Sequence, residues 1–323
     1  MPVYNQLDLC RQCLASLEAQ TFRDFKIILV DDGGTQDYQG LIGEFSNLKI
    51  GYNRNDKNLG AINNIFNTIF FPVQSDYVMS MHEDDLLHPE YLKIAVANLV
   101  ANPQSVFIGS NCIFFDRRQD IDALVTLKPS STSVEYAVPD FVRFLLQDNP
   151  FMLASVIYRS EVLKTAKQPD LKELSIACDR PFLIDLMKFR TCLILDEPLF
   201  FSRRHGKKDM RGRDLSWQQA FGLFEYYRNH LPQPLSLSDT KIFLIGATNN
   251  LLLTYRSLFL DRRSSRLNYI MEGERRGLIK FRYLNSKGCF GLLSMCLGSC
   301  LSFFLLNLVQ KSRQFFKPSR FYV

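Results

Sequence analysis

Short apolar runs alternate with helix-forming segments over the first two hundred residues, and this alternation constrains the fold more than any other feature. Runs that read as strands cover residues 25–30, 48–52, 77–81, 105–115 and 193–201. Short connections between strands and helices favour a mainly parallel sheet with helices on both faces. The sequence therefore predicts an α/β domain. Its expected helices lie near residues 7–17, 38–45, 60–70, 89–101, 138–146 and 179–188.

Acidic residues directly follow two of these predicted strands. They are Asp31, Asp32, Glu83, Asp84 and Asp85. In open α/β sheets the carboxyl ends of the strands form the ligand-binding edge. Clustered carboxylates repel one another unless a positive partner is present, and their oxygens suit Mg²⁺ or Mn²⁺. Two interpretations stay open at this point: a metal site that holds a phosphorylated substrate, or a solvated acidic turn before a helix.

Some of these acids also have a simpler explanation as helix caps. Aspartates are good N-caps, so Asp31, Asp32 and Asp179 could do no more than begin a helix. The recurrence of acids at two strand ends of one sheet favours a ligand site for Asp32 and Asp84. Asp179 stands near the start of its predicted helix, where capping and catalysis are both open.

The net charge of +6 hides a strong asymmetry along the chain. Residues 1–202 carry 18 Lys and Arg against 26 Asp and Glu, a net charge of −8. Residues 203–323 carry 21 against 7, a net charge of +14, and have helical spacing with leucine and aromatic faces. A basic, aromatic-rich tail predicts an anionic partner such as a membrane surface or a diphosphate-bearing substrate. Nucleic-acid binding is not expected, because it leaves the ordered acidic strand ends unexplained.

A stretch of 22 residues without charge, 288–309, lies inside this tail. Its length can cross a bilayer, but serine, asparagine and glycine dilute it. A single membrane span and an in-plane or protein-buried helix both stay open. The eight cysteines form no disulfide ladder and no secretory signal opens the chain, which predicts a reducing, cytosolic compartment. Residues 1–5 read as the end of a strand, so most of that strand is expected to be missing.

Taken together, the motifs of the chain resemble those of family 2 glycosyltransferases, which are inverting nucleotide-sugar enzymes with a GT-A fold. The resemblance covers about residues 1–205. The matching pieces stand in family order: Pro2-Val3-Tyr4-Asn5, Gln20-Thr21-Phe22, Val30-Asp31-Asp32-Gly33, Asn58-Leu59-Gly60, Glu83-Asp84-Asp85 with Pro89, and Cys178-Asp179-Arg180. The resemblance implies a GT-A catalytic domain in residues 1–205 and a helical, basic C-terminal extension in residues 206–323.

The resemblance also implies a role for individual positions. Asp179 falls at the position of the catalytic base, and Asp84 at that of the direct metal ligand. Arg204 and His205 resemble the segment before a loop that closes over the donor, with His205 a second candidate metal ligand. Arg54 is an alternative to Lys57 for reaching the base or the diphosphate. The positions assigned to the donor site are Pro2, Tyr4, Asp31, Asp32, Lys57, Asn58, Gly60, Glu83 and Arg204.

Two positions depart from the family pattern. His82 stands where many members have the first acid of the metal motif; an imidazole can bind manganese or a phosphate instead. Cys178 stands where many members have a glutamate before the base, so the second carboxylate that would orient Asp179 is missing.

These observations predict an inverting glycosyltransferase that uses Mn²⁺ or Mg²⁺. Its donor would be a nucleotide sugar, and its acceptor a hydroxyl of a glycan or lipid-linked glycan in bacterial surface-polysaccharide biosynthesis. The basic tail would dock on the anionic, cytoplasmic face of the inner (plasma) membrane. The alternative, favoured by His82 and Cys178, is a non-catalytic nucleotide-sugar-binding or scaffold protein at the membrane.

Overall fold

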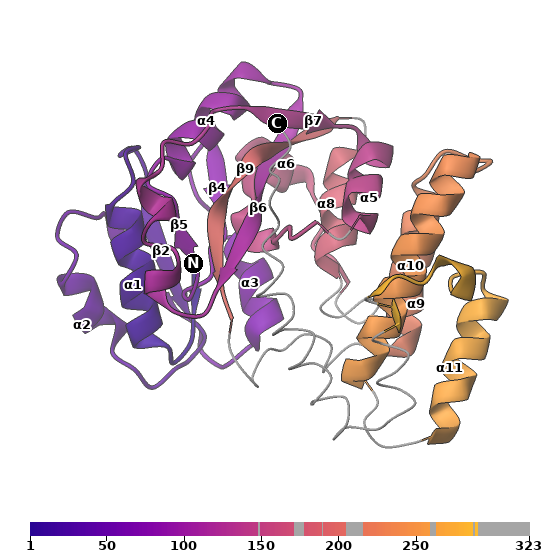
Figure 1. The fold of residues 1–323 in the computed structure, drawn as a ribbon. Coiled ribbons are helices and arrows are strands. Elements are labelled where there is room, and N and C mark those ends of the chain that lie inside the picture. The colour runs from indigo at the N-terminus through magenta and orange to yellow at the C-terminus, as the bar shows by residue number, and fades with distance from the viewer. Residues whose placement is uncertain are drawn as a thin grey trace. The chain divides into compact units, whose positions relative to one another are not determined.

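The chain forms two compact units in the computed structural model: residues 1–170 with 178–209, and residues 171–177 with 210–323 (Figure 1). The structure describes residues 1–147, 149–170, 178–188, 190–204, 216–258, 263–286 and 288–289. The domain boundary predicted at residue 205 falls among residues 205–215, outside this described part.

A three-stranded parallel sheet opens the first unit, in the order β1 (Pro2–Val3), β2 (Ile27–Asp31), β3 (Ile50–Arg54). Three helices follow these strands: α1 (Leu7–Glu18), α2 (Tyr38–Gly43) and α3 (Ala61–Ile69). The register places Asp31 opposite Val3 on one side and opposite Arg54 on the other. The alternation read from the sequence is therefore realised here as parallel pairing, as expected for strands joined by crossover helices.

A second sheet of six strands completes the first unit. Its members are β4 (Tyr77–Met79), β5 (Leu86–Leu87), β6 (Ser105–Phe115), β7 (Ser133–Tyr136), β8 (Ile157–Arg159) and β9 (Thr191–Arg203). The order is β4-β8-β6-β9-β5, and β7 pairs with β9. Among the described strands of this second sheet, only β6 and β9 pair in parallel, so this sheet is mixed, whereas the sequence pattern predicted mainly parallel pairing. The segment between β6 and α5 contains β7 near its end.

The strand directions bring three carboxyl ends to one edge of this sheet. β8 runs antiparallel to both β4 and β6, so β4 and β6 point the same way. β9 is parallel to β6 and shares that direction. The turn that follows β4 therefore lies at the edge where β6 and β9 also end, the position at which open α/β sheets bind ligands.

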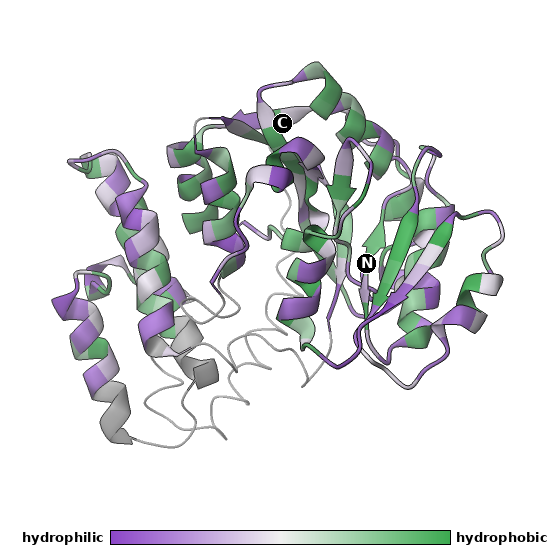
Figure 2. Ribbon diagram, turned by 180° about the vertical axis from the view of Figure 1, so that it is seen from behind, coloured by the Kyte–Doolittle hydropathy of each residue, from purple (hydrophilic) through white to green (hydrophobic). Residues whose placement is uncertain are grey.

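Helices flank these strands and bury their apolar faces against them. They are α4 (Tyr91–Ala101), α5 (Val138–Leu146), α6 (Ser160–Thr165) and α8 (Asp179–Met187), with 3₁₀ turns η1 (Arg118–Asp120), η2 (Leu124–Thr126) and η3 (Leu153–Ser155). Figure 2 shows that hydrophobic residues dominate the strands of this unit. The helix expected from Pro89 begins two residues later, at Tyr91, because Glu90 occupies the N-cap position.

The second unit is helical where the structure describes it. Its elements are α9 (Trp217–Asn229), α10 (Leu237–Leu258), α11 (Arg263–Arg275) and η6 (Phe281–Tyr283). The Phe221 and Tyr269 rings stack with their centroids 4.8 Å apart, which packs α9 on α11. Among the described helices, none combines the length and the apolar character needed to cross a membrane. The uncharged stretch 288–309 lies outside the described residues from residue 290 onward.

The aromatic core of the first unit gives a direct test of this fold. Phe107 of β6 is wholly buried, and its ring lies 5.8 Å from that of Phe141 and 6.3 Å from that of Tyr158. We expect Phe107→Ala to lower the free energy of unfolding by about 3–5 kcal/mol in denaturant titration, because a large buried side chain leaves a cavity. Val100→Ala, at a residue that is 66% exposed, should change it by less than about 0.5 kcal/mol. Equal effects of the two changes would contradict this packing.

Candidate active site

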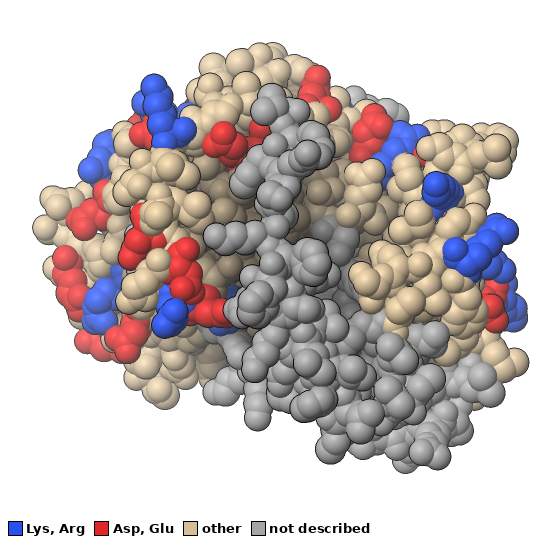
Figure 3. All heavy atoms as spheres, viewed as in Figure 1, with Lys and Arg blue, Asp and Glu red and all other residues tan. Residues whose placement is uncertain are grey.

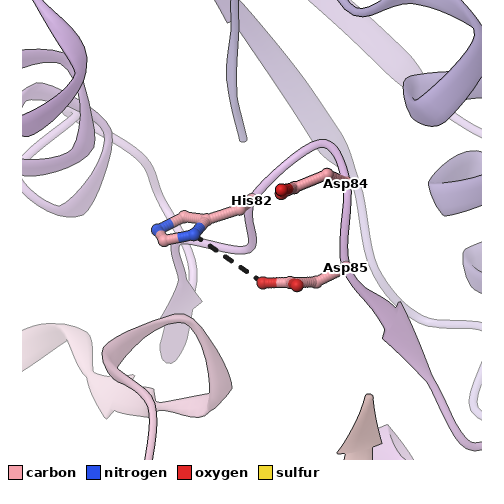
Figure 4. A group of neighbouring side chains, drawn as sticks. All are labelled: His82, Asp84 and Asp85. Carbon is pink, nitrogen blue, oxygen red and sulfur yellow. Dashed lines mark ion pairs between the residues drawn. The ribbon is translucent and has the colours of Figure 1, made fainter. Parts of the chain in front are cut away.

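The turn between β4 and β5 gathers three potential metal ligands. One ligand atom each from His82, Asp84 and Asp85 lies within 4.8 Å of the others. Figure 4 shows that both carboxylates face the side of the turn on which the His82 ring lies, with His82 Nδ1 3.7 Å from Asp85 Oδ2. The other ring nitrogen, Nε2, is buried without a hydrogen-bond partner among the described residues. An imidazole nitrogen and two carboxylates form a donor set that fits Mn²⁺ well and Mg²⁺ acceptably.

Burial controls the charge state of this cluster. It raises the pKa of Asp85 well above its usual range, and the neighbouring charge of Asp84 raises it further. Burial also lowers the pKa of His82, which favours the neutral imidazole that can bind a metal. A cation between the carboxylates would remove their mutual repulsion.

Arg203, at the end of β9, holds the turn in place. Its backbone N–H donates to Asp85 Oδ1 at 3.0 Å, and its Nε donates to the Asp84 carbonyl oxygen at 3.1 Å. Its Nη2 donates to Gln12 Oε1 at 2.8 Å, which joins the turn to α1. The guanidinium also lies 4.5 Å from the centroid of the Phe115 ring. The last residue of β9 therefore fixes the turn that carries His82, Asp84 and Asp85 against two other elements.

Glu83 stands in the same turn, but its carboxylate is engaged elsewhere. Oε1 accepts the Tyr4 N–H, and Oε2 accepts the Tyr38 hydroxyl, both at 2.6 Å. Burial raises the pKa of Glu83 to about 7. In the structure the acid triplet divides: Asp85 joins His82 and Asp84 in the cluster, and Glu83 does not. Alternation of side chains in an extended segment would put Asp85 on the face of Glu83, opposite His82 and Asp84, so it does not predict this cluster.

Asp31 shapes the loop that follows β2. Its buried Oδ2 accepts the Tyr52 hydroxyl and Arg54 Nη1, both at 2.7 Å, and Oδ1 accepts the Gly34 N–H at 2.8 Å. Arg54 Nη2 donates to the Gly34 carbonyl oxygen at 2.7 Å. The pairing of β2 with β3 explains this ion pair, because Asp31 and Arg54 are opposite each other in register.

Asp32 joins the loop after β2 to the start of α3. Its Oδ1 accepts the Leu59 N–H at 2.8 Å, and its Oδ2 accepts the Gly60 N–H at 2.9 Å. Asn58 Nδ2 donates to the Asp32 carbonyl oxygen at 3.0 Å. Gly33 has φ +75°, and an added Cβ there would lie 3.3 Å from the Asn58 backbone nitrogen, so glycine allows this close approach. Both predicted donor-site aspartates therefore organise backbone in this structure.

The remaining donor-site positions differ in their exposure. Pro2 is buried in β1, whereas Tyr4 is 46% exposed at the end of that strand. Lys57 and Asn58 are exposed in the loop before α3. Arg204 is exposed, with its guanidinium 5.4 Å from the centroid of the Phe114 ring, while His205 lies outside the described residues.

Asp179 is the first residue of α8, and its side chain is 23% exposed. Its Oδ1 accepts the Arg180 N–H at 2.8 Å, and Arg180 Nε lies 3.4 Å from Oδ2. Arg180 Nη2 donates to the Phe151 carbonyl oxygen at 3.0 Å, and Phe151 bridges to Asn111 of β6. Through Arg180 and Phe151, these contacts connect the start of α8 to Asn111 of β6. The preceding Cys178 is 1% exposed and burial raises its pKa, so its thiol cannot replace a carboxylate.

Comparison with known proteins gives a consistent result. Residues 1–129 match the sequence model of the family described as glycosyl transferase family 2. An uncharacterized glycosyltransferase of Haemophilus influenzae is 26% identical over 192 residues, covering 58% of this chain and 70% of that protein. A second one from the same species is 27% identical over 168 residues, or 50% of this chain and 60% of that protein. The chain thus matches 60–70% of the length of these two relatives.

Solved structures share the fold of this chain at low sequence identity. S. aureus TarS 1-349 in complex with UDP-GlcNAc aligns with a TM-score of 0.54 and 16% identity, over 91% of this chain and 89% of that chain. The same protein without ligand aligns with a TM-score of 0.51 and 18% identity, over 85% and 90%. The predicted GT-A type α/β fold is confirmed by this likeness.

The raised pKa of Glu83 predicts how stability depends on pH in metal-free protein. The folded state holds this proton up to pH about 7, whereas an exposed glutamate loses it near 4.5. The stabilising contribution is therefore complete below pH 4.5 and is lost as pH rises to about 7. We expect the free energy of unfolding of wild type relative to Glu83→Gln to fall by up to about 3 kcal/mol across this window. Glu161→Gln, at a side chain that is 69% exposed, should keep the wild-type profile, and a flat difference for Glu83→Gln would contradict the assignment.

Proposed function

We propose that this glycosyltransferase, whose residues 1–129 match the model of glycosyl transferase family 2, moves a sugar from a nucleotide-sugar donor to a hydroxyl group of a glycan acceptor. The reaction inverts the anomeric carbon and uses Mn²⁺ or Mg²⁺. The observation that carries this proposal is the convergence of His82, Asp84 and Asp85 at the carboxyl edge of the second sheet.

His82, Asp84 and Asp85 would hold the cation, with His205 as a further candidate ligand. When bound there, the cation supplies positive charge beside the departing diphosphate. Arg203 keeps the turn in the geometry that presents both carboxylates. The cationic side chains of Lys57 and Arg204 would contact the diphosphate from the loops that carry them.

Asp179 acts as the general base in this mechanism. It accepts the proton of the acceptor hydroxyl, whose oxygen attacks the anomeric carbon from the face opposite the nucleotide. The ion pair with Arg180 orients the carboxylate from one side, and its exposed part leaves room for an acceptor. Cys178 provides no second carboxylate, so Arg180 is the group that positions the base in this chain.

The donor nucleotide would lie between β1 and the loops that follow β2 and β3. Tyr4 is exposed at the end of β1, while Pro2 supports it from within the sheet. Asp31 and Asp32 fix the backbone around Gly33 and would contribute backbone groups or spare lone pairs to the base and ribose. Asn58 and Gly60 belong to the same wall of the site. Because TarS binds UDP-GlcNAc and UDP in solved structures, uridine nucleotides are the first donors to test.

The role of the two acids can be tested with matched variants. We expect Asp84→Ala and Asp179→Asn each to lower nucleotide-sugar turnover by about a hundredfold or more, because one loses a metal ligand and the other the base. Asp76→Asn, before β4, and Asp185→Asn, later in α8, remove exposed acids and should retain near-wild-type turnover. Turnover is measured as release of nucleoside diphosphate from a panel of UDP-, GDP- and TDP-sugars with Mn²⁺.

The outcome also separates this proposal from its rival. A non-catalytic nucleotide-sugar-binding or scaffold protein would bind the nucleotide, shown by a thermal shift, without turning over any donor. Near-normal turnover in Asp84→Ala or Asp179→Asn would reject the role given to that residue.

Membrane docking is the second part of the proposal. The second unit carries exposed Arg275 and Arg282 together with the exposed apolar residues Met271 and Phe281. Figure 3 shows several Lys and Arg side chains on this unit near one end of α11, with an acidic side chain beside them. Positive charge combined with apolar side chains suits an anionic lipid surface. We propose that this surface holds the enzyme at the cytoplasmic face of the plasma membrane, near a lipid-linked glycan acceptor of surface-polysaccharide biosynthesis.

Sedimentation with lipid vesicles tests this docking. The full chain should sediment with phosphatidylglycerol-rich vesicles at low salt, stay in solution with phosphatidylcholine vesicles, and be released by salt. Lys280→Glu with Arg282→Glu should weaken the binding several-fold. Arg23→Glu with Lys26→Glu, the same charge change on the first unit, should not. Aggregate-free protein that stays in solution with the anionic vesicles would contradict the proposal.

A further inference from the structure

Within the segment His82–Asp85, only the Glu83 side chain does not face the candidate metal cluster. The residue is 5% exposed, and both of its carboxylate oxygens accept hydrogen bonds from other elements. Its neighbours on each side, His82 and Asp84, are candidate metal ligands. A shift of this turn on binding a cation must therefore be transmitted to whatever Glu83 holds.

Glu83 holds the turn that follows β1 through a continuous chain of hydrogen bonds. The Tyr4 N–H donates to Oε1 at 2.6 Å. The Tyr38 hydroxyl donates to Oε2 at 2.6 Å and accepts the Gln6 N–H at 3.1 Å. The backbone is thus fixed on both sides of Asn5, which has φ 53°, a conformation that few residues other than glycine adopt.

The same turn is also tied to the loop after β2. Asn5 Oδ1 accepts the Thr35 N–H at 2.7 Å. Tyr4 is 46% exposed, next to the loop whose shape Asp31 fixes through the Gly34 N–H. One short, buried chain of hydrogen bonds therefore joins the part of the proposed donor site that would hold the nucleotide base to the part that would hold the metal. Glu83 is the central link in this chain.

Removing that link has a predictable cost. Short hydrogen bonds to a carboxylate are stronger than neutral ones. Deleting the carboxylate would leave the Tyr4 N–H and the Tyr38 hydroxyl without their acceptor. The turn at His82–Asp85 and the turn at Tyr4–Gln6 would then respond to cation binding independently instead of together.

We propose that Glu83 is a positioning residue that couples cation binding at His82, Asp84 and Asp85 to the order of the Tyr4–Gln6 turn that presents Tyr4 to the donor. The proposal rests on the proposed function for the presence of a cation at this turn. The coupling itself depends on the pair Glu83 and Tyr38.

Hydrogen exchange on the full chain tests this coupling with Mn²⁺ alone as the probe. Mn²⁺ binding is followed by the loss of the free-ion EPR signal, and amide exchange of residues 4–6 by mass spectrometry of the N-terminal peptide. In wild type, saturating Mn²⁺ should slow the exchange of these amides about fivefold or more. A factor of about five is the lower end of the usual range for coupling between two sites in a protein. Asp84→Ala should abolish both Mn²⁺ binding and the slowing.

Variants of the link separate coupling from general stability. Glu83→Ala should bind Mn²⁺ without slowing exchange at residues 4–6. Glu83→Gln should rescue the response, because its amide oxygen can accept the Tyr4 N–H and its NH₂ group can donate to Tyr38. Tyr38→Phe keeps the ring and removes one link, so it tests the coupling even if Glu83→Ala does not fold. Tyr91→Phe, which removes a fully buried hydroxyl elsewhere, should respond like wild type.

The outcomes distinguish this inference from the function on which it rests. If Mn²⁺ binds to wild type but exchange at residues 4–6 is unchanged, the coupling is refuted and the proposed function stands. The coupling is likewise refuted if Glu83→Ala or Tyr38→Phe responds as fully as wild type. If wild type does not bind Mn²⁺ at all, the metal-assisted function and the coupling both fail.

Discussion

The repulsion between Asp84 and Asp85 in one short turn is the constraint on which the rest of the site depends. Asp85 is buried, and the neighbouring charge adds to the cost of ionising it. Several contacts keep these acids together: Arg203 binds the turn from β9, and Glu83 binds it to β1 and α2. A fold that only needed a polar turn would gain nothing from this arrangement. The proposed cation between the acids would replace this repulsion with attraction.

The two aspartates after β2 illustrate a different use of buried carboxylates. Asp31 accepts three hydrogen bonds from β3 and from its own loop, and Asp32 accepts the backbone N–H groups before α3. These bonds determine the loop geometry before any ligand arrives. Preformed loops lower the entropic cost of binding, since less ordering is left for the ligand to cause. The proposed donor site would thus consist of organised backbone, with Tyr4 as an exposed side chain on it.

The sequence predicted the elements well and their pairing less well. The bounds of β6 and α5 were predicted to the residue, because long apolar periodicity and a proline near the helix start are strong local signals. The mixed second sheet was not predicted, since the direction in which β8 meets β4 and β6 depends on contacts between distant segments. The separation of Glu83 from Asp84 and Asp85 was not predicted for a related reason: the side to which each acid of the turn points is decided by Arg203 and Tyr38, far away in the sequence.

Electron spin-echo spectroscopy of bound Mn²⁺ tests the central claim most directly, because it detects nitrogen atoms coordinated to the ion. A cation held by His82, Asp84 and Asp85 should show coupling to an imidazole nitrogen. That coupling should disappear in His82→Ala while a weaker Mn²⁺ site remains. Bound Mn²⁺ without nitrogen coupling, or with a coupling that survives in His82→Ala, would contradict the account.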